Sequence, residues 1–213
     1  MKKRVSWIVM IILVLVFAYW YAHIAKMNMI YDKGVDNSEY ISMGILEDQR
    51  VEQKFVCRED TMDGIYVKCQ VTGDVADVNV CYRITSGSPN TPVASGSYPA
   101  SELKASKFNK LTFDTIEDSR DKEYTLSIWS DPVSARKGVS FYYQPETEEG
   151  TELTIGGSAV NGTMIMRTVT NRFDMETFCV VIIFIAFITA FMKILYKLFE
   201  FFFIIVMKSN ILN

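Results

Sequence analysis

Hydrophobic positions along this chain form two long runs, one near each end, and a series of short alternating runs between them. Residues 5–24 and residues 178–192 contain no charged side chain. An α-helix rises about 1.5 Å per residue, so about 20 apolar residues cross a hydrocarbon core of about 30 Å. The pattern therefore predicts a membrane-spanning helix near each end of the chain.

Between these runs, hydrophobic and polar residues alternate with a period of two. Successive side chains of a β-strand point to opposite faces, so the alternation predicts antiparallel strands with one buried and one solvated face. Turn signals rich in Gly, Pro, Asn and Asp separate the expected strands, which are residues 51–57, 65–71, 78–84, 93–98, 110–113, 123–129, 139–143, 152–155 and 163–169. Nine strands in about 120 residues fit one sandwich of two sheets.

The predicted fold class is all-β, an antiparallel two-sheet sandwich of jelly-roll type flanked by an N-terminal and a C-terminal transmembrane helix. Only residues 101–107 hint at a helical turn. The expected segments are a transmembrane helix over residues 1–26, a linker over 27–46, the sandwich over 47–170, a second transmembrane helix over 171–195, and a cytoplasmic interfacial helix and tail over 196–213.

Basic residues predict the orientation of the two spans. Lys and Arg that flank a span tend to stay on the cytoplasmic side. Lys26 and Arg172 are single charges at the inner ends. The larger sets lie at the outer ends and consist of Lys2, Lys3, Arg4, Lys193, Lys197 and Lys208. We therefore expect a plasma-membrane protein with both termini in the cytoplasm and residues 27–176 outside.

A cleaved signal peptide is the alternative to the first anchor. The apolar run of a signal peptide usually holds about 7–15 residues and ends at a cleavage pattern such as A-x-A. The run in this chain is longer, and residues 18–25 lack that pattern. Tyr19, Trp20 and Tyr21 are typical of the aromatic belt at a membrane surface. We favour an uncleaved anchor over processing near Ala25.

The outer segment is acidic. Residues 27–176 contain 15 Lys and Arg against 24 Asp and Glu, a net charge of −9 that the value of −3 for the whole chain hides. Nucleic acids and anionic headgroups favour positively charged partners. The composition therefore argues against a nucleic-acid partner.

Cysteine and histidine are scarce. Cys57, Cys69 and Cys81 lie in the outer segment, and Cys179 lies in the second span. We expect Cys57 and Cys69 to point into the core from neighbouring strands and Cys81 to face outward, as small side chains rather than a disulfide framework. One disulfide among the three is the alternative. The only histidine, His23, ends the first span, so we expect no zinc site.

The sequence offers no set of catalytic residues. Catalytic triads need a histidine or an equivalent base, and the outer segment has no histidine. Residues 59–63 and 114–118 supply carboxylates for a glycosidase or a calcium ion, but both groups fall in expected turns, where Asp usually bonds its own backbone. We expect no catalytic residue and no cofactor; calcium is an option without a specific ligand spacing.

Outward-facing aromatic residues are candidates for a ligand surface, because an aromatic ring offers an apolar face beside polar groups. Tyr124, Leu126 and Ile128 should share the core face of their strand, which directs the next residue outward. The candidates for a combined aromatic and polar surface are Trp129, Tyr142, Tyr66, Lys68 and Gln70. The alternative is that these aromatic rings pack under loops or against a partner.

Two patterns in the membrane segments indicate helix contacts. Small residues spaced by four allow close packing of helices, and they are Ala18, Ala22, Ala186 and Ala190. A narrow polar stripe after the second span consists of Lys193, Lys197 and Glu200. It fits an interfacial helix with snorkelling lysines, or alternatively a surface that docks on a larger, multi-spanning membrane protein.

Several strand and turn motifs resemble a known class of domain. They are Gln53-x-Phe55, DGIYVKC at residues 63–69, VNVCYRI at 78–84, and KLTFDTIEDSRDKEYTLSIWS at 110–130. Their order is similar to that of jelly-roll sandwich domains outside the membrane in bacterial envelope proteins, often attached to glycosyltransferase-like proteins with many spans. Those domains look like carbohydrate-binding modules. The resemblance covers about residues 47–170 and transfers no functional residue.

Two main hypotheses for function follow. The first is a non-enzymatic accessory or glycan-binding subunit of a cell-envelope polysaccharide system. The second is a self-assembling scaffold similar in topology to polysaccharide chain-length regulators. Those proteins carry long outer helices and a Pro-rich entry to the second span, whereas residues 171–176 contain no Pro. We favour the first; a hydrolase using turn carboxylates is a third option.

Overall fold

The computed structural model describes residues 2–47, 49–87, 91–131 and 136–211, and the side chains of residues 5–202 within these ranges. The chain divides into two compact units. One unit is formed by Ala25–Asn171. The other combines Met1–Ile24 with Arg172–Asn213.

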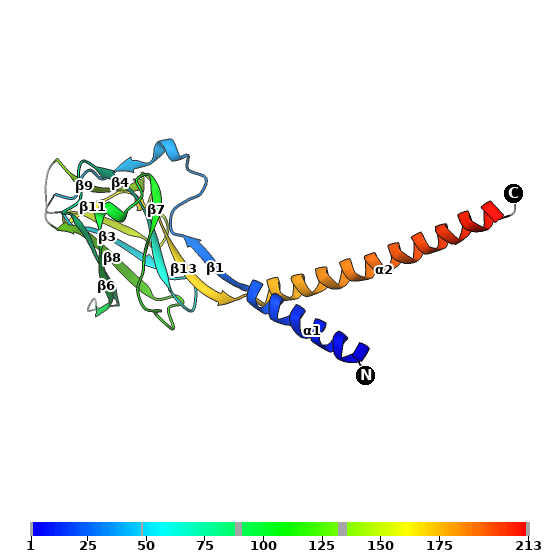
Figure 1. The fold of residues 1–213 in the computed structure, drawn as a ribbon. Coiled ribbons are helices and arrows are strands. Elements are labelled where there is room, and N and C mark those ends of the chain that lie inside the picture. Colours follow the sequence, from blue (N-terminus) through cyan, green and yellow to red (C-terminus); the bar gives the residue numbers. More distant parts are fainter. Residues whose placement is uncertain (1, 48, 88–90, 132–135, 212–213) are drawn as a thin grey trace. The chain divides into compact units, whose positions relative to one another are not determined.

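Two antiparallel sheets form the unit Ala25–Asn171 (Figure 1). The strands of the seven-stranded sheet are β1 (His23–Met29), β2 (Ile41–Ser42), β4 (Gly64–Thr72), β7 (Lys107–Leu111), β9 (Gly138–Gln144), β12 (Thr163–Met164) and β13 (Met166–Phe173). They pair in the order β1-β13-β4-β9-β12, with β7 on β4 and β2 on β9.

The second sheet has six strands. They are β3 (Val51–Val56), β5 (Asn79–Ser86), β6 (Thr91–Pro99), β8 (Glu123–Asp131), β10 (Glu152–Ile155) and β11 (Ser158–Val160). Their order is β11-β10-β3-β8-β5-β6. Two short 3-10 turns, η1 (Asn37–Glu39) and η2 (Ala100–Glu102), complete this unit, and η2 overlaps the helical turn expected after residue 100.

The hydrophobic core lies between the two sheets, as the alternating pattern predicts. Along β8, Tyr124, Leu126 and Ile128 are buried. Phe55 on β3 and Phe141 on β9 are fully buried and belong to the same core cluster. The nine expected strands are confirmed, the last of them as the consecutive strands β12 and β13. The two-sheet sandwich is therefore confirmed.

The expected linker over residues 27–46 is wrong. β1 and β2 lie within or overlap this stretch, and the compact unit begins at Ala25 rather than at residue 47. The β1 sequence HIAKMNM contains a single β-branched residue and three polar ones, so its local strand signal is weak. Its strand conformation comes from pairing with β13, which local sequence does not reveal.

In the hairpin between β10 and β11, the sequence predicts the turn more clearly than it predicts the second strand. Gly156 and Gly157 both adopt positive φ angles, 58° and 80°. Ile155 pairs with Ser158 across this two-residue loop, the geometry of a type I′ turn, which favours glycine. The Gly-Gly signal marks the turn, although the three-residue β11 that follows it is too short to predict.

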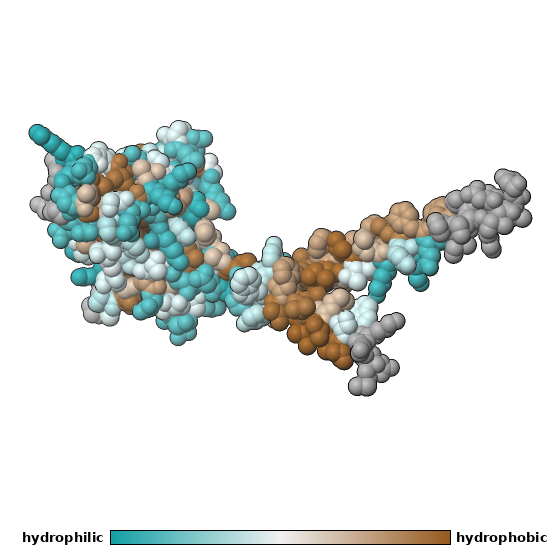
Figure 2. All heavy atoms as spheres, viewed as in Figure 1, coloured by the Kyte–Doolittle hydropathy of each residue, from teal (hydrophilic) through white to brown (hydrophobic). Residues whose placement is uncertain are grey.

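Two helices belong to the other unit: α1 (Lys2–Tyr21) and α2 (Met175–Ile211). Hydrophobic residues cover most of both helices, whereas the sandwich surface is largely hydrophilic (Figure 2). Among the described residues, only the segment Met175–Phe202 is long and apolar enough to cross a membrane. The apolar part of α1, Val5–Tyr21, is shorter because β1 begins at His23, so the expected N-terminal span is not confirmed.

α2 is also longer than expected. It continues without interruption from Met175 to Ile211, across the boundary at residue 195 where we expected a separate interfacial helix. No Gly or Pro occurs in this stretch, so nothing in the local sequence ends or kinks the helix.

Candidate functional site

The outer face of the seven-stranded sheet carries a set of cations stacked on aromatic rings. Antiparallel pairing places Arg167 of β13 opposite Tyr66 of β4, and Lys68 of β4 opposite Phe108 of β7. The Cζ atom of Arg167 lies 3.7 Å from the centroid of the Phe108 ring. Its Nε and Nη2 atoms donate hydrogen bonds of 3.3 Å and 2.9 Å to the Tyr31 hydroxyl. The guanidinium is thus fixed by an aromatic face and a phenol oxygen.

Lys68, like Arg167, lies over aromatic rings. Its Nζ atom lies 4.7 Å from the centroid of the Tyr40 ring and 5.8 Å from that of Tyr142. Burial, and to a smaller extent the charge of Arg167, lower the pKa of Lys68. Burial and the neighbouring Tyr31 raise the pKa of Tyr40. We call this set of residues the cation–aromatic surface: Tyr31, Tyr40, Lys68, Phe108, Tyr142 and Arg167.

A hollow of about 410 Å³ lies beside this surface. Its aromatic and cationic walls include Tyr31, Tyr40 and Arg167. The loop that follows β1 contributes the polar lining Lys33, Asp36 and Asn37. The Asp36 carboxylate accepts hydrogen bonds from the Ser38 backbone N (2.8 Å) and Oγ (2.7 Å), which lower the pKa of Asp36. The hollow thus combines two aromatic rings with hydrogen-bonding groups.

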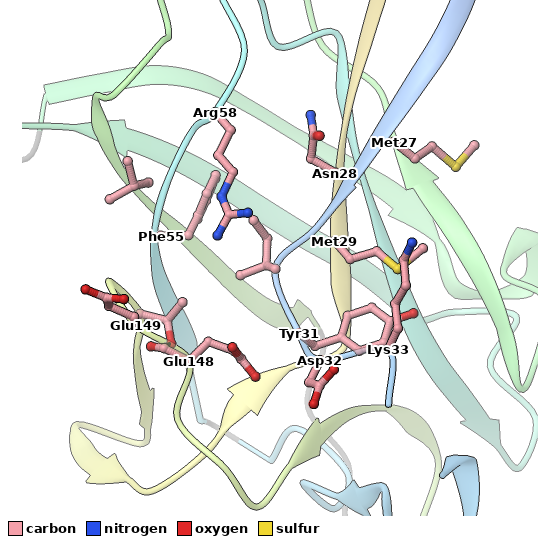
Figure 3. Close-up of a pocket in the computed structure, with 13 residues that line it drawn as sticks. Met27, Asn28, Met29, Tyr31, Asp32, Lys33, Phe55, Arg58, Glu148 and Glu149 are labelled. Atoms are coloured by element: carbon pink, nitrogen blue, oxygen red, sulfur yellow. Dashed lines mark hydrogen bonds between the residues drawn. The ribbon is translucent and has the colours of Figure 1, made fainter. Parts of the chain in front are cut away.

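A second hollow, of about 530 Å³, shares Met29, Tyr31 and Lys33 with the first (Figure 3). Consecutive residues of β1, Phe55 of β3 and Arg58 line it. Glu148 and Glu149 lie on its other side, in the segment before β10. The Oε1 atom of Glu148 accepts a 2.8 Å hydrogen bond from Gln144 Nε2, so this carboxylate is already held by the fold. The lining carries both charge signs and two aromatic rings, Tyr31 and Phe55, and Phe55 is fully buried in the core.

The structure brings together four of the five sequence-predicted ligand residues. Tyr66, Lys68 and Gln70 are half-exposed on β4, and Tyr142 is half-exposed on neighbouring β9. The Gln70 Oε1 atom accepts a 2.8 Å hydrogen bond from Ser106 Oγ. These residues share one sheet, and the Lys68 ammonium lies over the Tyr142 ring.

Trp129 does not belong to this surface. It lies on β8 of the six-stranded sheet, between β3 and β5. The Cζ atoms of Arg50 and Arg83 lie 4.7 Å and 6.0 Å from the centroid of its ring. The expectation of one surface containing both Trp129 and Tyr142 is therefore wrong, because the two residues occupy different sheets of the sandwich.

Sequence reasoning missed four residues of the cation–aromatic surface. Tyr31 and Tyr40 lie in the stretch that we expected to be a linker. Phe108 is the second residue of β7, which begins at Lys107, whereas the expected strand began at residue 110. Arg167 lies in the last strand, β13. The available signal was the outward position of Arg167 between the buried residues Met166 and Thr168, but the neighbouring strand was unknown.

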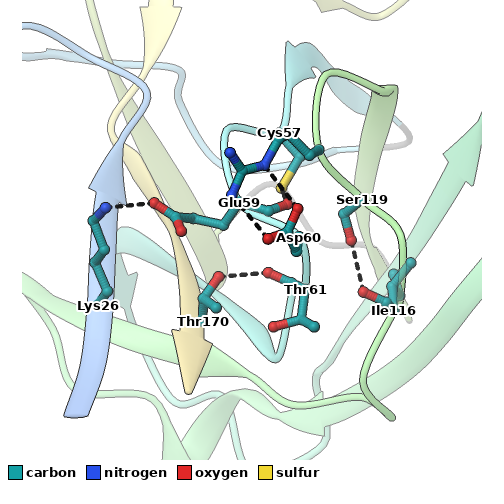
Figure 4. A network of polar contacts seen from close by, with 9 residues as sticks. Lys26, Cys57, Glu59, Asp60, Thr61, Ile116, Ser119 and Thr170 are labelled. Carbon is teal, nitrogen blue, oxygen red and sulfur yellow. Dashed lines mark hydrogen bonds and ion pairs between the residues drawn. The ribbon is translucent and has the colours of Figure 1, made fainter. Parts of the chain in front are cut away.

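The carboxylates of the turn at residues 59–63 have partners within the fold, and Figure 4 shows two of them. Glu59 is almost fully buried, and its Oε1 atom lies 2.6 Å from the Lys26 Nζ atom of β1. Arg120 donates to both carboxylate oxygens of Asp60, at 2.7 Å and 2.8 Å. Asp63 accepts a 2.8 Å hydrogen bond from the Asn171 backbone N. Among the described residues, no group of three or more His, Cys, Asp or Glu is arranged to hold a metal ion.

The small residues of the membrane segments have different environments. Ala18 and Ala22 are fully buried, and the Ala22 carbonyl accepts a 2.8 Å hydrogen bond from the Asp174 backbone N, which immediately precedes α2. Ala186 and Ala190 are exposed on α2. The four alanines therefore do not form one contact between the two helices.

The polar stripe Lys193, Lys197 and Glu200 lines one shallow groove of α2. The Lys193 Nζ atom lies 5.0 Å from the centroid of the Trp7 ring of α1, so one member of the stripe contacts the chain itself. The side chains of the flanking basic residues Lys2, Lys3, Arg4 and Lys208 lie outside the described residues.

The four cysteines, all within the described residues, are free thiols. Cys57 and Cys69 are buried, as expected. They are not on neighbouring strands, because Cys57 follows β3 of one sheet and Cys69 lies in β4 of the other. Burial raises the pKa of Cys69 to about 11, and burial also raises the pKa of Cys57. Cys81 is half-exposed on β5, opposite Trp129.

Iodoacetamide at about pH 8 should label Cys81 of the folded protein and leave Cys57 and Cys69 unlabelled, since the reagent needs an accessible thiolate. Cys81 should react more slowly than a free thiol, because burial and the charge of Asp131 raise its pKa. Peptide mass spectrometry measures the labelling, and all three should react in urea. Native labelling of Cys69 at the rate of Cys81 would contradict the buried position of Cys69.

Comparison with known protein families finds no family that matches this sequence, and comparison with curated proteins likewise finds no match. The function is therefore argued from the fold and from the cation–aromatic surface.

Proposed function

We propose that this chain is a non-enzymatic, membrane-anchored binding protein whose sandwich binds glycan outside the cell membrane. The observation that carries the proposal is the hollow beside Tyr31, Tyr40 and Arg167, where aromatic rings and hydrogen-bonding groups line the same space. Sugars present apolar C–H faces that stack on rings and hydroxyls that need polar partners. A hollow of about 410 Å³ has the size of a small-ligand site.

In the proposed topology, α1 and α2 both cross the plasma membrane and residues 27–176 lie outside. The apolar part of α2, Met175–Phe202, is long enough to cross a membrane and supports the C-terminal span of this topology. The 17 apolar residues Val5–Tyr21 of α1 would span about 26 Å, close to the lower limit for a membrane helix. The buried Ala18 and Ala22 support packing of this helix against a neighbour.

The role of the protein in this proposal is that of an accessory subunit of a cell-envelope polysaccharide system. The jelly-roll resemblance of residues 47–170 supports a carbohydrate-binding role. Lys197 and Glu200, which are exposed on α2, are the residues proposed to dock on a multi-spanning membrane protein. Charged residues in an otherwise apolar helix are costly in a membrane unless they are paired or reach its surface.

The test is binding of the full-length protein, reconstituted in lipid nanodiscs, to a panel of cell-wall and capsular glycans. Tyr40→Ala should weaken binding of a retained glycan at least about tenfold, because a stacked ring contributes about 1.4 kcal/mol. Trp129→Ala is the matched control, since it removes a half-exposed ring from the opposite sheet.

Circular dichroism of both variants establishes that the sandwich remains folded. Retention of no glycan on the panel would overturn the proposed function. Equal losses for Tyr40→Ala and Trp129→Ala would place the binding surface elsewhere.

A further inference from the structure

The two sheets of the sandwich differ sharply in charge. As the structure describes them, the seven strands of the sheet that carries the cation–aromatic surface contain no Asp or Glu. Within Ala25–Asn171, these strands carry the basic residues Lys26, Lys68, Lys107, Lys110 and Arg167. The strands of the six-stranded sheet carry the acidic residues Glu52, Glu123, Asp131 and Glu152 against the basic residues Lys54 and Arg83. Of the basic residues of the seven-stranded sheet, Lys68, Lys110 and Arg167 share the outward register of Tyr66, so a domain with an acidic balance carries a locally basic surface there.

Strand register concentrates this positive charge. Tyr66 of β4 pairs with Arg167 on one side and with Lys110 on the other, so the two cations flank one aromatic ring. Lys68 lies two residues further along the same face of β4. Like charges at such positions repel each other. Burial lowers the pKa of Lys68, and the charge of Arg167 lowers it further.

No carboxylate of the described residues forms an ion pair with Lys68 or Arg167. The carboxylate that lines the neighbouring hollow, Asp36, is engaged by Ser38. Arg167 uses Nε and Nη2 to contact Tyr31, and its Nη1 atom has no hydrogen-bond partner among the described residues. A guanidinium with remaining donors beside a lysine suits a carboxylate or phosphate group.

From this arrangement we infer that the glycan bound at the cation–aromatic surface is anionic, bearing carboxylate or phosphate groups that contact Lys68 and Arg167. This inference rests on the proposed glycan-binding function. The rings of Tyr40 and Tyr142 provide the apolar faces for the sugar, and the two cations provide the charge that discriminates an acidic glycan from a neutral one.

The experiment measures binding of four soluble polymers to the full-length protein in nanodiscs of zwitterionic lipid. The polymers are polygalacturonate, phosphomannan, neutral dextran and polyglutamate. One or both acidic glycans should bind at least about tenfold more tightly than dextran and polyglutamate, and added salt should weaken this binding because it screens exposed charges. Tighter binding of polygalacturonate would identify carboxylate as the preferred group, and tighter binding of phosphomannan would identify phosphate.

Variants test the residues. Lys68→Met should weaken binding of the acidic glycan at least about fivefold, and Lys68→Arg, which keeps the charge, should largely retain it. Lys122→Met is the charge-matched control, because Lys122 is an exposed lysine immediately before β8 of the other sheet, and it should leave binding unchanged. Circular dichroism confirms folding of each variant.

Each other outcome overturns a distinct claim. Equal affinity for dextran and the acidic glycans would overturn the anionic preference and leave the proposed glycan binding intact. Polyglutamate binding as tight as that of the acidic glycans would show a surface for polyanions in general and overturn the glycan assignment. Equal losses for Lys68→Met and Lys122→Met would overturn the role of Lys68.

Discussion

Replacing Gln53 with methionine should lower the free energy of unfolding of the sandwich by about 3 kcal/mol, since a buried donor left without a partner costs about 1–3 kcal/mol and further hydrogen bonds are lost. Gln53 is fully buried on β3. Its Oε1 atom accepts a 2.7 Å hydrogen bond from the Met164 backbone N of the opposite sheet. Its Nε2 atom donates to the carbonyls of Lys54 (2.8 Å) and Glu152 (3.1 Å).

Methionine has nearly the length and volume of glutamine, so Gln53→Met removes these hydrogen bonds without leaving a large cavity. Urea unfolding of the full-length chain in detergent, followed by the β-sheet signal in circular dichroism, measures the change. Gln70→Met is the control: Gln70 is half-exposed on β4, and its loss should cost less than about 1 kcal/mol. Equal losses for the two variants would show that Gln53 does not link the sheets.

Gly96→Val should destabilise the sandwich by at least about 2 kcal/mol, because overpacking of a well-filled core costs about 1–3 kcal/mol or more. A Cβ atom at Gly96 would lie 2.5 Å from Oη and 2.8 Å from Cε1 of the Tyr82 ring on the paired strand. Tyr82 is buried, and its hydroxyl donates a 2.7 Å hydrogen bond to the Thr112 carbonyl. The Tyr82 ring also stacks on Tyr98, so it cannot shift away from Gly96 without disturbing this contact or the hydrogen bond of its hydroxyl.

Ser97→Val is the matched control for Gly96→Val. Ser97 is the next residue of β6, and it is exposed on the opposite face of the strand. Valine suits a strand, so this change should alter the free energy of unfolding by less than about 0.5 kcal/mol. The same urea titration measures both variants. A Gly96→Val protein as stable as Ser97→Val would mean that the Tyr82 ring does not lie over Gly96.

The period-two alternation was enough to predict the strands of the sandwich, because the buried face of a strand carries a hydrophobic residue at every second position. Tyr124, Leu126 and Ile128 are an example. β1 was missed because its sequence mixes Lys26 and Asn28 with methionines, and its conformation depends on β13, which begins more than 130 residues later in the chain. Contacts of this range leave little trace in local propensity.

The candidate site was predicted in part, for a similar reason. The outward positions of Tyr66, Lys68 and Tyr142 follow from alternation alone. Which outward residues share a surface depends on which strands pair, and Trp129 was grouped with Tyr142 although β8 and β9 belong to different sheets. Arg167 could be recognised as part of the surface only after β13 was seen to pair with β4.

The pairing of β1 with β13 brings the two ends of the sandwich domain together. The Asp174 backbone N bonds the Ala22 carbonyl, and the Ile30 backbone N bonds the Met166 carbonyl, so the entering and leaving strands run antiparallel as neighbours. The chain thus enters and leaves the domain through two neighbouring strands, as in domains that can be inserted into the chain of another protein. A sandwich connected in this way can be replaced by another domain while both helices stay in the chain.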